Sequence, residues 1–97
     1  MKLRFTPRAI ADMAAIADYI ATESPQGALR VRDAILQSLK VLVDFPRIGR
    51  RQSVEGVRKL VTRRYGYLVY YLLDDATDEI VVLTVQHPAR ERPTSDS

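Results

Sequence analysis

At 97 residues the chain has room for one small domain and not for two hydrophobic cores. A hydrophobic fraction of 46%, a charged fraction of 28% and a net charge of only +3 are those of a folded protein, which excludes an intrinsically disordered chain. The chain has one histidine and no cysteine, so we predict no disulfide, no metal site, no cofactor and a cytoplasmic location.

The first half of the chain predicts a short strand followed by two helices. Apolar and basic residues alternate at the start, which is the period of a half-buried strand. Thr6-Pro7 and Ser24-Pro25 each place a capping hydroxyl before a proline, a combination typical of a helix N-terminus, and apolar residues then recur at helical spacing. The predicted elements are a strand at 2–5 and helices from Pro7 to about Thr22 and from Pro25 to Val43.

Both predicted helices carry a wide apolar arc. In the first helix we expect the core-facing stripe to contain Ile10, Met13, Ala14, Ala17 and Ile20, with Ala9 and Ile16 widening it. Arg8, Asp12 and Asp18 lie on the opposite face. Each arc is wider than one packing contact requires, which predicts that a partner covers part of it.

The second half predicts an open loop and three strands. Pro46, Gly49 and Gly56 interrupt the helical period between residues 44 and 56. Three apolar runs follow, separated by short polar turns, which indicates consecutive antiparallel strands at 57–62, 67–73 and 80–86. The expected fold class is α+β, with order β-α-α-β-β-β and a helical hairpin packed on a mainly antiparallel four-stranded sheet. The single domain spans 1–92, and 93–97 is expected to be a flexible tail.

Alternation along the strands assigns the aromatic residues and the histidine to faces. Tyr67 and Tyr71 share one face of their strand and Tyr70 takes the other. His87, just after the last strand, is expected on the side of Val81, Leu83 and Val85. Each of the tyrosines could be core or part of an interface, and His87 could be a hydrogen-bonded strand-end residue or a catalytic group.

Basic charge is concentrated in the segment 47–64. The segment contains seven basic residues and a single acid, Glu55, so it alone carries a net charge of +6. Such a patch favours an acidic partner, either a nucleic acid or an acidic protein, and it is equally compatible with a solvated surface. The basic residues are Arg47, Arg50, Arg51, Arg58, Lys59, Arg63 and Arg64.

The order of these elements resembles the RelE/ParE superfamily of toxins from type II toxin–antitoxin systems, with the closest likeness to ParE-type plasmid-stabilisation toxins. Four segments carry the resemblance, in the family's order: LRFTPRAIADMAAIADYIA, LVDFPRIGRR, VRKLVTRRYGYLVYYLLDD and IVVLTVQHPAR. The resemblance implies a cognate antitoxin, of ribbon-helix-helix type, whose own N-terminal domain contacts DNA in place of this chain. We place the antitoxin contact at Ile16, Tyr19, Ile20 and Leu29, beside the main packing stripes.

The resemblance implies two targets. ParE-type members poison DNA gyrase, whereas RelE-type members cut messenger RNA on the ribosome. A nuclease would draw its acid, base and phosphate-binding groups from His87, Arg90, Arg58 and Arg64. The histidine-using nucleases usually carry a tyrosine after the histidine and an arginine before the LVY stretch, where this chain has Pro88 and Tyr67.

Those two departures favour a gyrase inhibitor that is not an enzyme, with an mRNA endoribonuclease as the alternative. In either case we expect the target to face the basic residues Arg58, Arg63, Arg64 and Arg90. A module that binds nucleic acid without catalysis, through the basic stretch and the tyrosines, is a third interpretation.

Overall fold

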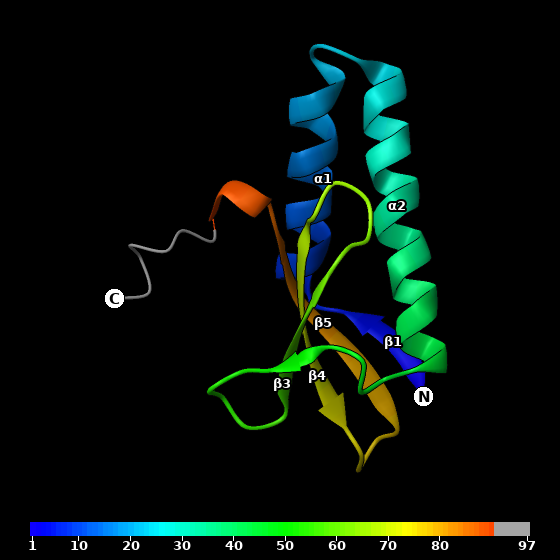
Figure 1. Ribbon diagram of the computed structural model, residues 1–97, viewed down its shortest axis with the longest axis vertical. Coiled ribbons are helices and arrows are strands. Elements are labelled where there is room, and N and C mark those ends of the chain that lie inside the picture. Colours follow the sequence, from blue (N-terminus) through cyan, green and yellow to red (C-terminus); the bar gives the residue numbers. More distant parts are fainter. Residues whose placement is uncertain (91–97) are drawn as a thin grey trace.

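The computed structural model describes residues 1–90 and shows two antiparallel helices packed against one curved sheet (Figure 1). Within that part of the chain, no helix combines the length and the apolar character needed to cross a membrane. The elements are β1 (Lys2–Phe5), α1 (Pro7–Ala21), α2 (Pro25–Asp44), β2 (Arg50–Arg51), β3 (Val57–Val61), β4 (Leu68–Asp74), β5 (Glu79–Gln86) and the 3-10 turn η1 (Pro88–Arg90). The predicted tail lies outside the described residues.

The predicted helix starts are confirmed in atomic detail. The hydroxyl of Thr6 accepts a hydrogen bond from the Ala9 N–H at 3.0 Å, and the hydroxyl of Ser24 accepts one from the Gly27 N–H at 2.9 Å. In both helices proline follows the cap, where its missing N–H costs no hydrogen bond. The two cap-and-proline pairs therefore fix where the helical hairpin begins and where it turns.

The sheet has five strands in the order β1-β5-β4-β3-β2, so the expectation of four strands is wrong. The additional strand, β2, is the pair Arg50–Arg51, which lies antiparallel to β3 opposite Lys59 and Arg58. Two residues are too few to show an alternating pattern, and sequence alone assigned them to a loop. The mainly antiparallel character is confirmed, because only β1 and β5 run parallel.

The core lies between the helices and one face of the sheet. Its fully buried members include Ile35 and Leu39 of α2, and Val69, Tyr71 and Val82 of the central strands. In α1 the core-facing stripe is rotated from the expected one. Ile10, placed in the core from sequence, is 60% exposed, whereas the inward positions are Ala9, Met13, Ile16 and Ile20.

A bulge in β5 changes the faces assigned near its end. Tyr70 pairs with Thr84 and Tyr71 pairs with Val82, so Leu83 is an extra residue without a partner in β4. The helix-facing residues of β5 are consequently Ile80, Val82 and Val85, and Val81 is buried outside that cluster. The prediction that Val81, Leu83 and Val85 share one face is wrong for this reason, since strict alternation cannot anticipate a bulge.

Candidate functional site

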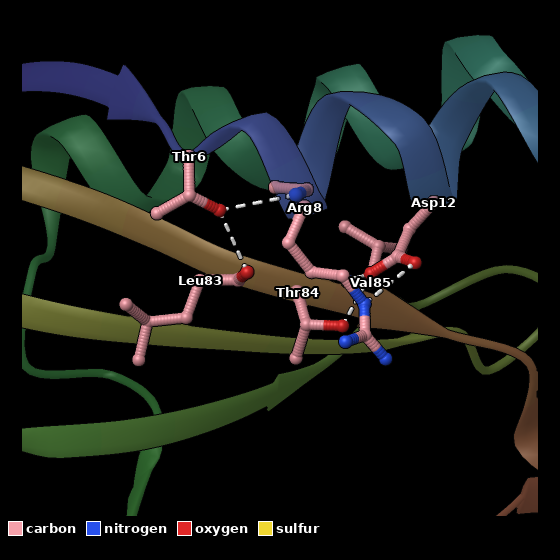
Figure 2. A network of polar contacts seen from close by, with 7 residues as sticks. Thr6, Arg8, Asp12, Leu83, Thr84 and Val85 are labelled. Carbon is pink, nitrogen blue, oxygen red and sulfur yellow. Dashed lines mark hydrogen bonds and ion pairs between the residues drawn. The ribbon is translucent and has the colours of Figure 1, made fainter.

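Beyond the bulge, α1 replaces β1 as the neighbour of β5. The backbone N–H of Thr6 donates to the Val82 carbonyl at 3.0 Å, and its hydroxyl donates to the Leu83 carbonyl at 2.8 Å. Six residues further along the chain, in α1, the Asp12 carboxylate accepts the Val85 N–H at 3.1 Å and the Thr84 hydroxyl (Figure 2). Side chains thus satisfy an edge that β1, ending at Phe5, leaves open.

The Asp12 carboxylate is held in its charged form. Burial raises its pKa, but hydrogen bonds from Thr84, Val85 and Arg8, with the Arg8 charge, outweigh this and leave the pKa below its ordinary value of 3.8. The Arg8 Nε lies 3.2 Å from the carboxylate, one helical turn away. Asp12 is therefore a structural anion that accepts hydrogen bonds from two groups of β5 and from Arg8.

A groove of about 470 Å³ opens along this junction, between α1 and the end of β5. Tyr67, which is buried, forms its floor next to His87, with the two ring centroids 5.5 Å apart and the rings at 88°. Burial raises the pKa of the Tyr67 phenol. The groove is lined by Arg8, Asp12, Ala15, Ile16, Tyr19, Ile20, Tyr67, Val85, Gln86, His87 and Ala89.

The local turn orients the imidazole of His87, which is exposed. Its Nδ1 accepts a hydrogen bond from the Ala89 N–H at 3.0 Å, so a neutral ring carries its proton on Nε2. In that tautomer neither nitrogen has a lone pair free to take a proton from a substrate. Over residues 1–90, His, Asp and Glu side chains form no group of three that could hold a metal ion.

The groups named for a nuclease are only partly brought together. Arg64 lies on the turn between β3 and β4, with its guanidinium 5.5 Å from the Tyr65 ring centre. This turn approaches η1, since a Cβ added at Gly66 would lie 3.8 Å from Pro88. Arg63, on the same turn, is exposed. Arg90 ends η1, and its side chain lies outside the described part of the chain.

Arg58 is remote from His87 and has another use. It pairs with Tyr71, whereas His87 follows Gln86, which pairs with Leu68. Measured along the strands, His87 is therefore about 13 Å from the Arg58–Tyr71 pair, at about 3.3 Å per residue. The guanidinium Nη1 of Arg58 donates to the carbonyls of Arg47 at 3.0 Å and Gly49 at 2.8 Å.

The same loop is fastened by Tyr71, which is fully buried. The Tyr71 hydroxyl donates to the Pro46 carbonyl at 2.7 Å and accepts the Gly49 N–H at 2.9 Å. Burial raises the pKa of this phenol, and the Gly49 hydrogen bond and the Arg58 charge only partly oppose the rise. Any side chain at Gly49 would collide with Tyr71, because an added Cβ would lie 2.5 Å from the hydroxyl oxygen.

The residues expected to contact the antitoxin lie mostly in the groove. Ile16, Tyr19 and Ile20 line it, and Tyr19 is 74% exposed. Leu29 is also exposed, at 54%, but lies on α2 outside the groove lining. The groove thus joins part of the expected antitoxin contact to His87, two features that the sequence treated separately.

Sequence reasoning missed Asp12, Tyr71 and Gly49 as organising residues. From the sequence, Asp12 was placed with Arg8 and Asp18 on the outer face of the first helix, away from the core. For Gly49, the breaking of the helical period signalled a loop and gave no sign of contact with Tyr71. These contacts join residues far apart in sequence, so no local pattern announces them.

The chain belongs to the ParE toxin family of type II toxin–antitoxin systems, parDE, whose family model matches residues 3–92. It is 31% identical to the toxin RelE2 of Caulobacter vibrioides, over 89% of this chain and 93% of that protein. The chromosomal ParDE toxin–antitoxin system of P. aeruginosa contains a chain of similar structure, with a TM-score of 0.76 and 31% identity over 90% of this chain and 95% of that chain.

The fold is also that of the E. coli toxin–antitoxin complex RelBE, with a TM-score of 0.70 and 22% identity over 94% of this chain and 98% of the matched chain. These findings confirm a RelE/ParE-superfamily toxin. The protein is therefore a toxin of the type II toxin–antitoxin class.

Proposed function

We propose that the chain acts in the cytoplasm as a gyrase-inhibiting, non-enzymatic toxin of a plasmid-stabilisation module, held inactive by an antitoxin of ribbon-helix-helix type. The observation that carries the choice of target is the state of His87. Its Nδ1 is occupied by the Ala89 N–H, which leaves the neutral ring without a free lone pair for general-base catalysis. The ParE-type resemblance supplies the gyrase target itself.

The surroundings of His87 support the same proposal. Its ring neighbour is a phenol whose pKa is raised by burial, so Tyr67 does not supply a base. Asp12 lines the same groove, but its carboxylate is bound by Thr84, Val85 and Arg8. An inhibitor that works by surface complementarity needs no general base, and this arrangement fits such an inhibitor.

An mRNA endoribonuclease is the second candidate. The 31% identity to RelE2 favours it, as does the presence of a histidine beside a tyrosine in a groove with Arg8. For this candidate, substrate binding would have to turn the His87 ring or break its bond to Ala89 before the ring could accept a proton.

The deciding experiment adds purified toxin to a gyrase supercoiling and cleavage assay and, in parallel, to translating ribosomes with a primer-extension readout. We expect gyrase inhibition without message cleavage. We also expect His87→Ala to keep most of its toxicity in a growth assay, whereas loss of a general acid or base typically costs a nuclease about 10² to 10⁴ in rate. Codon-dependent cleavage of the message, with gyrase activity unaffected, would show that the toxin is an mRNA endoribonuclease and not a gyrase inhibitor.

We further propose that an antitoxin helix lies in the groove against Ile16, Tyr19 and Ile20, with a continuation of the antitoxin reaching Leu29 on α2. Exposed Tyr19 is the expected anchor, because a tyrosine offers a large apolar surface with a polar tip. Tyr19→Ser and Leu29→Ser should weaken the complex more than they lower the melting temperature of the toxin alone, since both side chains are exposed. Ile10→Ser is the matched control, since Ile10 is exposed on α1 and absent from the groove lining. Equal losses of binding and stability would identify these positions as core.

A further inference from the structure

A second surface lies on the loop that follows α2, and the groove does not include it. Phe45 and Ile48 are the first and last residues of a turn closed by a hydrogen bond from the Ile48 N–H to the Phe45 carbonyl at 3.1 Å. The Cα atoms at the ends of such a turn lie within about 7 Å of each other, and both side chains border the same hollow. Phe45 is 63% exposed and Ile48 is 53% exposed, and together with Asp44, Pro46 and Arg47 they border a shallow hollow of about 410 Å³.

This exposed apolar pair is held by buried polar groups. The Tyr71 hydroxyl binds the loop at Pro46 and Gly49, and Arg58 binds it at Arg47 and Gly49. Exposed loops without a role are usually held more loosely and tolerate change. A loop fixed from the core that presents two large apolar side chains has the character of a preorganised binding surface, since little conformational freedom is lost when a partner binds.

Positive charge lies next to the apolar pair. Arg47 borders the apolar hollow and also a second hollow of about 420 Å³, which Arg51 and Arg58 line as well. Two acids, Glu55 and Asp75, lie at the second hollow, and Asp75 is 3.8 Å from Arg47. Asp44 adds a third carboxylate at the apolar hollow, and exposed Arg50 adds a fourth guanidinium group to the same loop. The surface therefore combines apolar contact with a small excess of positive charge, which favours acidic groups.

We propose that the Phe45–Arg51 loop is a docking surface for an acidic segment of a partner protein that places an apolar side chain against Phe45 and Ile48. The inference rests on the proposed function in one respect: the partner is the toxin's target and not its antitoxin. Phe45 and Ile48 argue for a protein, because recognition of a nucleic-acid backbone needs cations and gains little from two exposed aliphatic and aromatic groups on a turn.

The test is a titration of the ¹⁵N-labelled full chain, followed by NMR, with a blocked peptide that carries aspartates on both sides of one phenylalanine. We expect shifts concentrated in the amides of residues 45–51. The same peptide with asparagine in place of aspartate should bind at least tenfold more weakly, and so should the acidic peptide to the variants Phe45→Ser and Arg47→Glu. The control Ile10→Ser, an equally exposed apolar site on α1, should bind like wild type.

Absence of shifts in residues 45–51 would overturn the inference, and so would stronger shifts there from an oligouridylate than from the acidic peptide, which would indicate a nucleic-acid surface. Thermal melting of each variant checks that the fold is intact. The gyrase assay then separates the two proposals. If wild type inhibits gyrase and Phe45→Ser inhibits it equally, the docking surface is wrong and the proposed function stands. If wild type leaves gyrase unaffected, the proposed function fails, and the peptide titration still decides the surface.

Discussion

The groove between α1 and β5 and the loop between α2 and β2 are both held by side chains that bind backbone atoms, but from opposite directions. At the groove, Asp12 reaches from the partly exposed face of a helix to the free edge of β5. At the loop, Tyr71 reaches outward from the centre of the sheet to Pro46 and Gly49. The first fastening is charged and near water, whereas the second is neutral and fully buried.

Because the two regions are held by different interactions, we expect different perturbations to disturb them. A buried phenol between two backbone groups depends on close packing, so changes of volume should disturb the loop most. A carboxylate near the surface depends on charge, so changes of pH should disturb the groove most. The two surfaces can therefore be perturbed one at a time, which allows binding at one to be measured while the other is intact.

The largest loss of unfolding free energy is expected from Gly49→Ala, which adds a methyl group against Tyr71. The added Cβ would lie 2.5 Å from the hydroxyl oxygen, 2.8 Å from a ring carbon and 3.0 Å from the Lys59 carbonyl oxygen, so either the ring or the loop must move. Overpacking of this kind costs about 3 kcal/mol. Urea unfolding followed by circular dichroism measures the loss.

A double-mutant cycle shows whether Tyr71 is the cause of that loss. Tyr71→Phe alone removes the hydroxyl that binds Gly49 and Pro46, which should cost about 1 to 2 kcal/mol. In the Tyr71→Phe background the nearest clash is gone, so Gly49→Ala should cost less than it does in wild type. If the losses of unfolding free energy from the two substitutions were additive, contact with the Tyr71 hydroxyl would not be the cause of the Gly49→Ala loss.

A smaller loss of unfolding free energy is expected from Asp12→Ala, which removes the contact between α1 and the edge of β5. The change leaves the Val85 N–H and the Thr84 hydroxyl without their acceptor and removes the partner of Arg8, at a cost of about 2 kcal/mol. Asp18→Ala is the matched control, because Asp18 is an exposed acid of the same helix and shares the gain in helix propensity. Equal stability of the two variants in urea would show that water replaces Asp12 at the strand edge.

Sequence predicted the parts of the fold that depend on local chemistry. The caps at Thr6 and Ser24, the helical hairpin and the three long strands follow from hydroxyl, proline and apolar spacing, which act within a few residues. The sharing of one face by Tyr67 and Tyr71 is likewise confirmed, since the regular part of β4 alternates.

The remainder depends on contacts between distant segments. The bulge at Leu83 and the pairing of Arg50–Arg51 with β3 arise when strands meet, so neither has a local signal. The rotation of α1 that exposes Ile10 follows from how the helix crosses β5, where Thr6 and Asp12 bind the strand edge. The groove and the contacts that hold the predicted loop were missed for the same reason, since both are assembled from segments that the chain brings together only on folding.

The smallest expected effect is one of pH, and it separates the two regions most directly. The pKa of Asp12 is lower in the folded protein than its ordinary value of 3.8, so the unfolded chain binds this proton more tightly. The stabilisation by the charged carboxylate is therefore complete above about pH 4 and is lost as the pH falls through the folded pKa. Tyr71 behaves oppositely, because its pKa is raised above 10.0 and its protonation changes only in strong alkali.

Acid should therefore loosen the groove while the loop stays fastened. Asp12→Asn keeps an acceptor oxygen for Val85 but removes the charge, so its deficit in unfolding free energy relative to wild type should shrink as the pH falls from about 5 to about 3. Asp18→Asn should show no such convergence. Over the same range, the difference between wild type and Tyr71→Phe should stay constant, since the phenol remains protonated. An Asp12→Asn deficit that does not change with pH would mean that Asp12 acts through hydrogen-bond geometry alone, and the contrast between a charged groove and a neutral loop would then fail.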